Sequence, residues 1–148
     1  MKIGIDLDGI ITPIGFVNPS IKLPQILYIF LLPLALFMLP SQDTKNKLKK
    51  LSQDHEIIII SARPSWTKLI TQQWLKFHKI PFSKLYCLGF GKGTKIRKLK
   101  VIKNEKIELF FEDNKRIREF LEKNSIKILP NLDLATLVLG QGNFLLKT

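Results

Sequence analysis

Residues 2–12 read KIGIDLDGIIT, an apolar run that meets two carboxylates and then a glycine. Short apolar runs that are rich in β-branched residues and stopped by glycine are typical of a buried strand that ends in a turn. Asp6 and Asp8 therefore stand at the carboxyl end of this strand. Side chains alternate along a strand, so the turn at Gly9 has to bring Asp8 back toward Asp6. Taken alone, these residues also fit a strand end with a solvated Asp-Gly turn.

The chain is strongly basic, with 24 Lys and Arg against 12 Asp and Glu, a net charge of +12 and a pI of about 9.9. Its 148 residues fit one domain, residues 1–148, with a core of its own. The positive charge indicates contact with nucleic acid, phosphorylated small molecules or an anionic membrane face. The single Cys87 excludes an internal disulfide, and the first residues do not resemble a signal peptide, so we expect a cytoplasmic protein.

Apolar runs and helical patterns alternate along the rest of the chain. The unbroken run EIIIIS at 56–61 is typical of a strand that is buried on both faces, which favours a parallel sheet. This alternation predicts βαβ units and an α/β fold, a three-layer, Rossmann-like parallel sheet flanked by helices. Further strands are expected at 85–88, 107–111 and 126–129, and helices at 42–53, 66–78, 94–104 and 115–123. In the helix 66–78, Leu69, Ile70, Trp74 and Phe77 follow the spacing of an apolar face, and Ser65 is expected to cap it.

Polar side chains stand where three of these strands end. Asp6 and Asp8 follow the first strand, Ser61 ends the second, and Glu112 and Asp113 follow the fourth. Because ligands of parallel sheets bind at the carboxyl ends of strands, these groups predict one site on one rim of the sheet. A surface turn of acids is the alternative interpretation of the last pair.

The order of these groups resembles motifs I, II and IV of the haloacid dehalogenase-like (HAD) phosphohydrolases, over residues 2 to about 123. The resemblance implies a phosphatase that hydrolyses a phosphomonoester through an aspartyl-phosphate on Asp6, with Asp8 as general acid and base. The segment ISARP at 60–64 looks most like the small nucleotidase and nucleic-acid-phosphatase branches. Ile10 replaces the Thr or Val of many members, which leaves the subfamily open.

The same resemblance assigns residues to phosphate. The hydroxyl of Ser61 and neighbouring backbone N–H groups would hold phosphate oxygens, so Gly9, Ala62 and Arg63 are expected to bind substrate. Arg63 would contact a phosphate or stack on a base, and pairing with a carboxylate is the structural alternative.

Metal and lysine positions also follow from the resemblance. Asp6, the carbonyl of Asp8, Glu112 and Asp113 would form an all-oxygen site suited to Mg²⁺ as cofactor. Motif III supplies a lysine that offsets the charge of the nucleophile and the phosphate. The candidates are Lys92, Lys95 and Lys98. Lys95 is slightly preferred because it starts its helix near the rim, whereas Lys98 lies one turn deeper, at a spacing to Glu112 that is also seen in the family.

Residues 23–40 carry no charge, and their length reaches the lower limit for a transmembrane helix. Three prolines predict two short pieces bent at Pro33 instead of one span. The helix 42–53 already supplies a crossover, so residues 13–40 are surplus and would emerge over the rim. We interpret them first as a small apolar cap insertion or a homodimer interface, and second as a membrane-surface contact.

Two other functions fit the sequence. One is a lipid-phosphate phosphatase docked on the membrane surface, as a peripheral membrane protein. The other is a non-catalytic HAD-like module that binds nucleic acid or membrane through the basic helix after Thr94. A binding module has no need of four site residues together, namely Asp6, Asp8, Ser61 and Asp113. Their presence favours an enzyme with a small phosphorylated substrate. The motifs leave the substrate, the oligomeric state and the role of residues 131–148 open.

Overall fold

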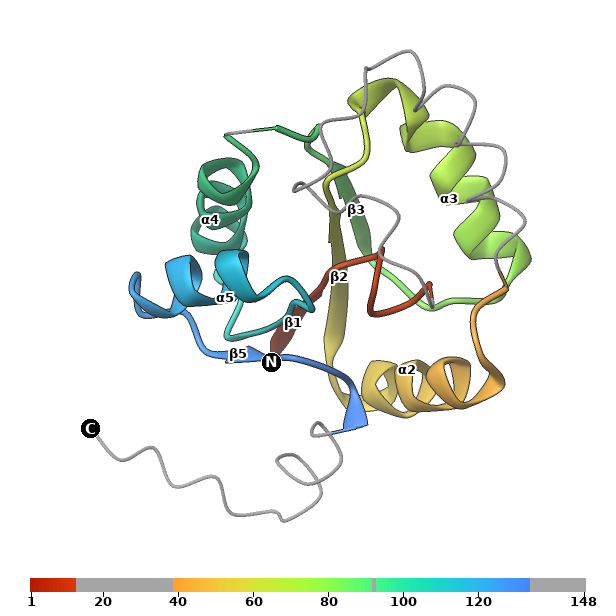
Figure 1. Cartoon of the computed structure of the whole chain (residues 1–148). Coiled ribbons are helices and arrows are strands. Elements are labelled where there is room, and N and C mark those ends of the chain that lie inside the picture. The colour runs from red at the N-terminus through yellow and green to blue at the C-terminus, as the bar shows by residue number, and fades with distance from the viewer. Residues whose placement is uncertain (13–38, 92, 134–148) are drawn as a thin grey trace.

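The computed structural model describes residues 1–12, 39–91 and 93–133. In this part of the chain, five parallel strands form one sheet in the order β3-β2-β1-β4-β5, with β1 at its centre (Figure 1). The strands are β1 (Lys2–Ile5), β2 (Glu56–Ser61), β3 (Lys84–Cys87), β4 (Leu109–Phe111) and β5 (Ile128–Leu129). The helices are α2 (Gln42–Asp54), α3 (Lys68–Phe77), α4 (Thr94–Glu105) and α5 (Lys115–Glu122). The expected α/β fold with a parallel sheet is confirmed.

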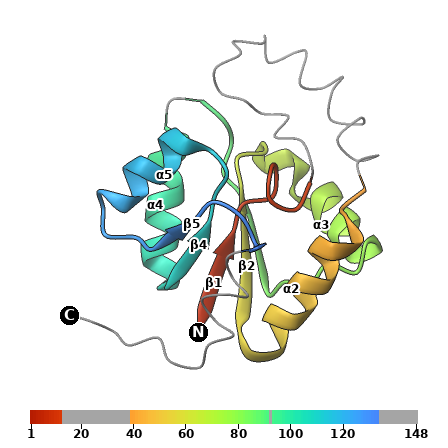
Figure 2. The same ribbon diagram turned by 60° about the horizontal axis from the view of Figure 1, so that its bottom comes forward.

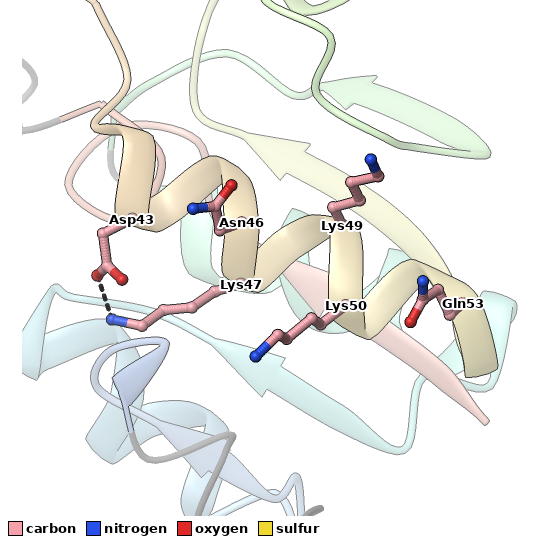
Figure 3. Close-up of a pocket in the computed structure, with 6 residues that line it drawn as sticks. All are labelled: Asp43, Asn46, Lys47, Lys49, Lys50 and Gln53. Carbon is pink, nitrogen blue, oxygen red and sulfur yellow. Dashed lines mark hydrogen bonds and ion pairs between the residues drawn. The ribbon is translucent and has the colours of Figure 1, made fainter.

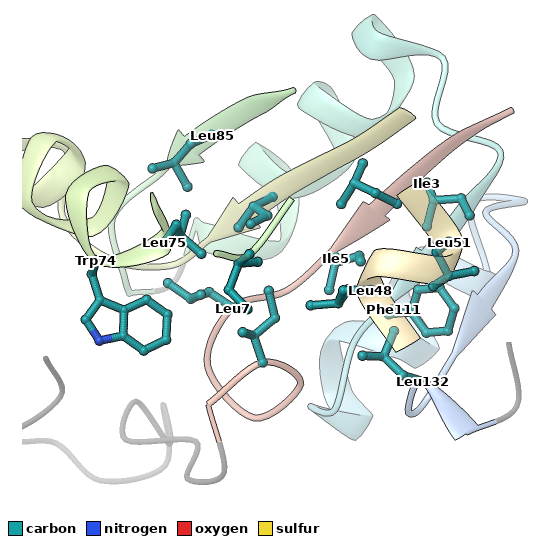
Figure 4. Packing of buried hydrophobic residues seen from close by; sticks show 14 of the residues in the cluster. Ile3, Ile5, Leu7, Leu48, Leu51, Trp74, Leu75, Leu85, Phe111 and Leu132 are labelled. Carbon is teal, nitrogen blue, oxygen red and sulfur yellow. The ribbon is translucent and has the colours of Figure 1, made fainter. Parts of the chain in front are cut away.

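The helices cover both faces of the sheet, so the domain has three layers (Figures 1 and 2). The alternation along β2 shows the two cores: Ile57 and Ile59 pack in one apolar cluster, and Ile58 and Ile60 pack in the other. The first cluster is covered by α2 and α3, and Figure 4 shows part of it. The second cluster is covered by α4 and α5. This is why the run EIIIIS is apolar at every inner position.

The glycine that interrupts the first apolar run has a packing role. Gly4 stands opposite Phe110 in the register of β1 and β4. A Cβ atom on Gly4 would lie 2.5 Å from Cδ2 of Phe110, which is fully buried. The missing side chain therefore makes room for an aromatic ring in the core.

Most helix boundaries agree with the sequence patterns. The side chain of Ser41 caps α2 by accepting a hydrogen bond of 3.0 Å from the backbone N–H of Thr44. Leu121 on α5 is fully buried, and Ile117 and Phe120 pack against the same cluster.

The helix expected at 66–78 differs in two ways. Ser65 caps nothing with its side chain, because Ser65–Thr67 form a 3₁₀ turn, η1, that leads directly into α3. The inner face also differs. It is formed by Thr67, Thr71, Trp74 and Leu75, whereas Leu69, Ile70 and Phe77 are exposed. The expected apolar face is therefore wrong for three of its four residues, because this helix carries apolar side chains on two faces.

The expectations for 13–38, for Lys92 and for 134–148 lie outside the described residues. This applies to the cap, the dimer interface and the membrane contact alike. Among the helices of the described ranges, none has the length and apolar content to cross a membrane.

Candidate active site

The carboxyl ends of β1 and β4 meet at Asp6. Its backbone N–H donates a hydrogen bond of 2.9 Å to the carbonyl of Phe111, which continues the pairing of the two strands by one residue. Glu112 follows directly, and its side chain is fully buried. The two acids expected on this rim therefore lie side by side under the surface.

Lys98 on α4 is placed between these acids. Its Nζ lies 2.9 Å from Oδ1 of Asp6 and 2.5 Å from Oε2 of Glu112. Burial raises the pKa of Asp6 well above its usual value, Glu112 raises it further and Lys98 opposes both. Burial alone would lower the pKa of Lys98, but the two carboxylates outweigh it and the pKa is raised. Lys98 is therefore an ammonium ion that offsets two buried negative groups.

Asp8 lies in a second cluster, around Arg63. Two nitrogens of the guanidinium hold the carboxylate in a fork, Nη2 at 2.6 Å from Oδ1 and Nε at 3.1 Å from Oδ2. The hydroxyl of Ser61 donates to Oδ2 at 3.3 Å, and that of Thr12 donates to Oδ1 at 3.4 Å. Nη1 of Arg63 reaches Oγ1 of Thr71 on α3 at 3.5 Å. Arg63 thus pairs with a carboxylate, the structural alternative of the sequence analysis, and Thr12 and Thr71 are partners that the motifs did not indicate.

Ser61 is the last residue of β2, and Ala62 follows it. Ser61 is fully buried, and its hydroxyl oxygen accepts a hydrogen bond of 3.1 Å from the backbone N–H of Arg63. Ala62 is half-buried beside it. The end of β2 therefore brings the expected phosphate-binding residues next to Asp8.

Asp113 completes a group of three carboxylates. Oxygens of Asp6, Glu112 and Asp113 lie within 4.8 Å of one another, with Asp113 exposed and the other two buried. The protein atoms on one side of this carboxyl partly remove it from water, which raises the pKa of Asp113, and the neighbouring Glu112 raises it further. Gly9 lies against this side chain with a φ of +99°, and a Cβ on Gly9 would be 2.0 Å from Oδ2 of Asp113. Only glycine allows the loop after β1 to pass so close to the carboxylate.

The residues present fit a hard divalent cation. Oδ1 of Asp6 is buried, and among the described residues its polar partner is the ammonium of Lys98 at 2.9 Å. It faces two further carboxylates, and carboxylate oxygens are the ligands that Mg²⁺ prefers. The side chain of Asp8 is outside this group, since Arg63 holds it.

The sequence was compared with protein families and with curated proteins. No protein-family model matches the chain. A provisionally named nucleotidase of Halalkalibacterium halodurans is 35% identical over 66 residues, which are 45% of this chain and 31% of the relative. A nucleotidase of Clostridium acetobutylicum is 30% identical over 88 residues, which are 60% of this chain and 43% of the relative. The chain therefore matches less than half the length of these curated relatives.

Two solved structures are similar to this chain over most of its length. A chain of the Pnkp1/Rnl/Hen1 RNA repair complex covers 88% of this chain with a TM-score of 0.68 and 16% identity, over 42% of its own length. The HAD domain of the effector protein Lem4 from Legionella pneumophila covers 86% with a TM-score of 0.51 and 16% identity, over 83% of its own length. The chain therefore has the fold of a HAD domain. This fold agrees with the resemblance drawn from the motif order.

Lys98, and not Lys95, lies beside Asp6 in the structure. Lys95 is exposed at the start of α4, with its Nζ 4.7 Å from the centre of the Phe120 ring. Lys98 lies one helical turn further on and has only 1% of its side chain exposed. The slight preference for Lys95 is therefore not supported by the geometry. The spacing from Lys98 to Glu112 is the sequence feature that indicates the lysine lying between Asp6 and Glu112.

A hollow of about 400 Å³ lies along α2, and its lining residues differ from those of the candidate active site (Figure 3). Lys47 forms ion pairs there with Asp43 and Asp133. None of the expected site residues lines it. Its lining consists of Asp43, Asn46, Lys47, Lys49, Lys50 and Gln53.

Proposed function

We propose that this HAD-like domain is a Mg²⁺-dependent phosphatase that hydrolyses a phosphomonoester through an aspartyl-phosphate on Asp6. One observation supports this proposal most directly. Carboxylate oxygens of Asp6, Glu112 and Asp113 lie within 4.8 Å of one another, beside the buried ammonium of Lys98. The nucleotidase names of the two relatives support a nucleotide as the substrate. The substrate is thus a small phosphorylated molecule.

The residues divide the reaction between them. A carboxylate oxygen of Asp6 attacks phosphorus, and the bond to the leaving alcohol breaks. Asp8 begins this step with a proton, gives it to the alcohol and becomes the carboxylate that Arg63 holds. Water then attacks the aspartyl-phosphate, Asp8 takes the proton of the water, and phosphate leaves Asp6. Lys98 offsets the negative charge that Asp6 and the phosphate bring together. Asp6, Glu112 and Asp113 would hold Mg²⁺, which when bound would neutralise charge on the phosphate oxygens.

The end of β2 orients this chemistry. Arg63 and Ser61 fix the carboxylate of Asp8 from two sides, so that its oxygens keep one orientation. We assign phosphate binding to the Ser61 hydroxyl and to the neighbouring backbone of Gly9 and Ala62.

The buried charged residues favour an enzyme over a non-catalytic binding module. Burying Asp6, Lys98 and Glu112 costs free energy that their mutual attraction repays only in part, and apolar residues of similar size serve a binding module as well or better. A phosphoryl-transfer site needs these groups under the surface.

The test is phosphate release from a panel of nucleoside monophosphates, sugar phosphates, p-nitrophenyl phosphate and phosphatidic acid, with Mg²⁺ and with chelator. Activity should require Mg²⁺, and Asp6→Asn should lower kcat by more than about 10³-fold while circular dichroism stays unchanged. Asp113→Asn should raise the Mg²⁺ concentration that gives half-maximal activity. The matched control is Asp43→Asn, which removes an exposed carboxylate on α2. Full activity of Asp6→Asn, or activity in chelator, would overturn the proposal.

A further inference from the structure

The outer side of η1 and α3 exposes four large apolar side chains. Trp66 is 62% exposed, Leu69 75%, Ile70 44% and Phe77 81%. Counted from Trp66, the others follow after three, four and eleven residues, which places all four on one side of a helix. The other side of α3 is buried in the core (Figure 4). We call these four residues the α3 outer face. Neighbouring apolar side chains that stay exposed in this way mark an interaction site.

Positive charge accompanies this apolar face. Lys68, Lys76 and Lys79 are exposed on the same helix or directly after it. Lys76 follows Leu69 by seven residues, which is about two helical turns, so it stands in line with the face. Residues 57–104 contain no aspartate or glutamate that could offset these lysines within the stretch. Exposed apolar side chains with lysines among them and a tryptophan at one end are typical of a helix that lies in a membrane interface.

The aliphatic side chains of the face distinguish between partners. A nucleic acid meets lysines through its phosphates, but it gives Leu69 and Ile70 no apolar surface, since its bases stack on aromatic rings. A second copy of the chain would set the same lysines against each other in a symmetric contact, and like charges across an interface cost affinity. An anionic membrane offers phosphates to the lysines and acyl chains to the apolar residues. It therefore matches both parts of the face.

We propose that the α3 outer face docks on the surface of an anionic lipid membrane. Trp66, Leu69 and Phe77 enter the boundary between headgroups and acyl chains, and the lysines contact lipid phosphates. This surface differs from both membrane contacts that the sequence analysis considered. It lies outside residues 23–40, and α3 covers the face of the sheet opposite to α4 (Figure 1). The inference does not rest on the proposed function.

Trp66 reports the contact directly. The chain has two tryptophans, and Trp74 is only 6% exposed in the core. In the full chain with Trp74→Phe, phosphatidylglycerol vesicles should shift the emission of Trp66 to the blue and lower its acrylamide quenching several-fold. Co-sedimentation should show binding to these vesicles that is about tenfold or more tighter than to phosphatidylcholine vesicles. If Trp74→Phe does not fold, the difference between the wild-type chain and Trp66→Phe gives the same signal.

Two double substitutions test the two parts of the face. Leu69→Gln with Phe77→Gln removes two side chains that are largely exposed, so circular dichroism should stay unchanged. Binding to phosphatidylglycerol vesicles should weaken by about tenfold or more, because the apolar area that enters the membrane is lost. Lys76→Gln with Lys79→Gln should also weaken this binding about tenfold, and added salt should weaken wild-type binding in the same direction.

The matched control is Lys100→Gln with Lys103→Gln, which removes the same two charges from exposed positions on α4. At about 0.1 M salt it should change vesicle binding by less than about twofold, since charges on the far side of the domain are screened. Full binding by the Leu69→Gln, Phe77→Gln chain, loss of binding in the α4 control, or no binding by the wild-type chain would overturn the proposal. A blue shift of Trp66 that appears without vesicles as the protein concentration rises would assign the face to a second copy and overturn it as well.

Discussion

The ammonium nitrogen of Lys98 lies 2.9 Å from a carboxylate oxygen of Asp6, and the two side chains are almost fully buried. The same nitrogen is 2.5 Å from Glu112. One cation thus compensates two acids that the ends of β1 and β4 force together. The charge balance of the site therefore depends on a single residue of α4.

Replacing Lys98 by methionine should impair both folding and activity. It leaves two buried carboxylates without their cation, which costs about 3–5 kcal/mol of the free energy of unfolding. It should also lower kcat by at least about 10²-fold, because the charge of the phosphate is no longer offset. Urea unfolding and phosphate release measure the two effects. Lys95→Met removes the same charge from the same helix, and it should stay close to wild type in both; equal losses in the two variants would contradict the assignment.

Gly9→Ala should destabilise the domain more than Gly91→Ala, although the two glycines have similar φ angles. Gly9 has a φ of +99°, and its new Cβ would collide with Oδ2 of Asp113 at 2.0 Å. Gly91 has a φ of +104°, and within the described part of the chain no heavy atom is found within 4 Å of a Cβ placed on it. Gly91→Ala therefore carries only the backbone cost of about 1–2 kcal/mol. Denaturant unfolding of both variants separates the collision from the backbone strain. The free energies of unfolding should differ by about 1 kcal/mol or more, and equal values would show that the loop yields.

The sheet could be predicted from the sequence because its signals are local. The run at 56–61 is apolar on both faces, and β2 covers the same residues. The apolar residues of α3 do not indicate which side of the helix is buried. Leu69 and Phe77 follow a helical spacing as well as Trp74 does, and only the position of the sheet determines which side is buried.

The site could be predicted as a set of strand-end residues but not in its pairings. Asp6, Ser61 and Glu112 follow strands, so topology alone brings them to one rim. The choice between Lys95 and Lys98 depends on how α4 is rotated against the sheet, which the sequence does not specify. The fork between Arg63 and Asp8 joins residues 55 positions apart and depends on the three-dimensional path of two loops.

Arg63→Lys should reduce turnover through its effect on Asp8. A lysine presents a single nitrogen and cannot reproduce the two contacts of the guanidinium at 2.6 and 3.1 Å. Because a small displacement of an acid–base group costs on the order of 10²-fold in rate, kcat should fall while KM changes little. Steady-state kinetics with one nucleotide substrate measure both quantities. Arg116→Lys, at an exposed position on α5, is the control. A higher KM with an intact kcat would instead assign Arg63 to the substrate.

Cys87 should be a slow thiol in the folded chain and a fast one after unfolding. It is the only cysteine, it is 9% exposed at the end of β3, and burial raises the pKa of its thiol. Thiolate is the reactive form, so both burial and the raised pKa slow the reaction with a disulfide reagent such as DTNB. Release of thionitrobenzoate with and without denaturant measures the difference, and Cys87→Ala gives the blank. Rapid reaction in the absence of denaturant would show that β3 opens readily.

The same shift predicts how Cys87 affects stability as pH changes. Since its pKa is higher in the folded than in the unfolded chain, the unfolded chain loses the thiol proton first as pH rises. The contribution of Cys87 is therefore complete below the usual pKa of a thiol and is lost as pH rises toward the folded value. Wild type and Cys87→Ala share all other titrating groups, so the difference in their free energies of unfolding isolates this effect. Above the usual thiol pKa, the free energy of unfolding of the wild type should fall relative to that of Cys87→Ala. A difference that stays constant with pH would show that burial does not perturb the thiol.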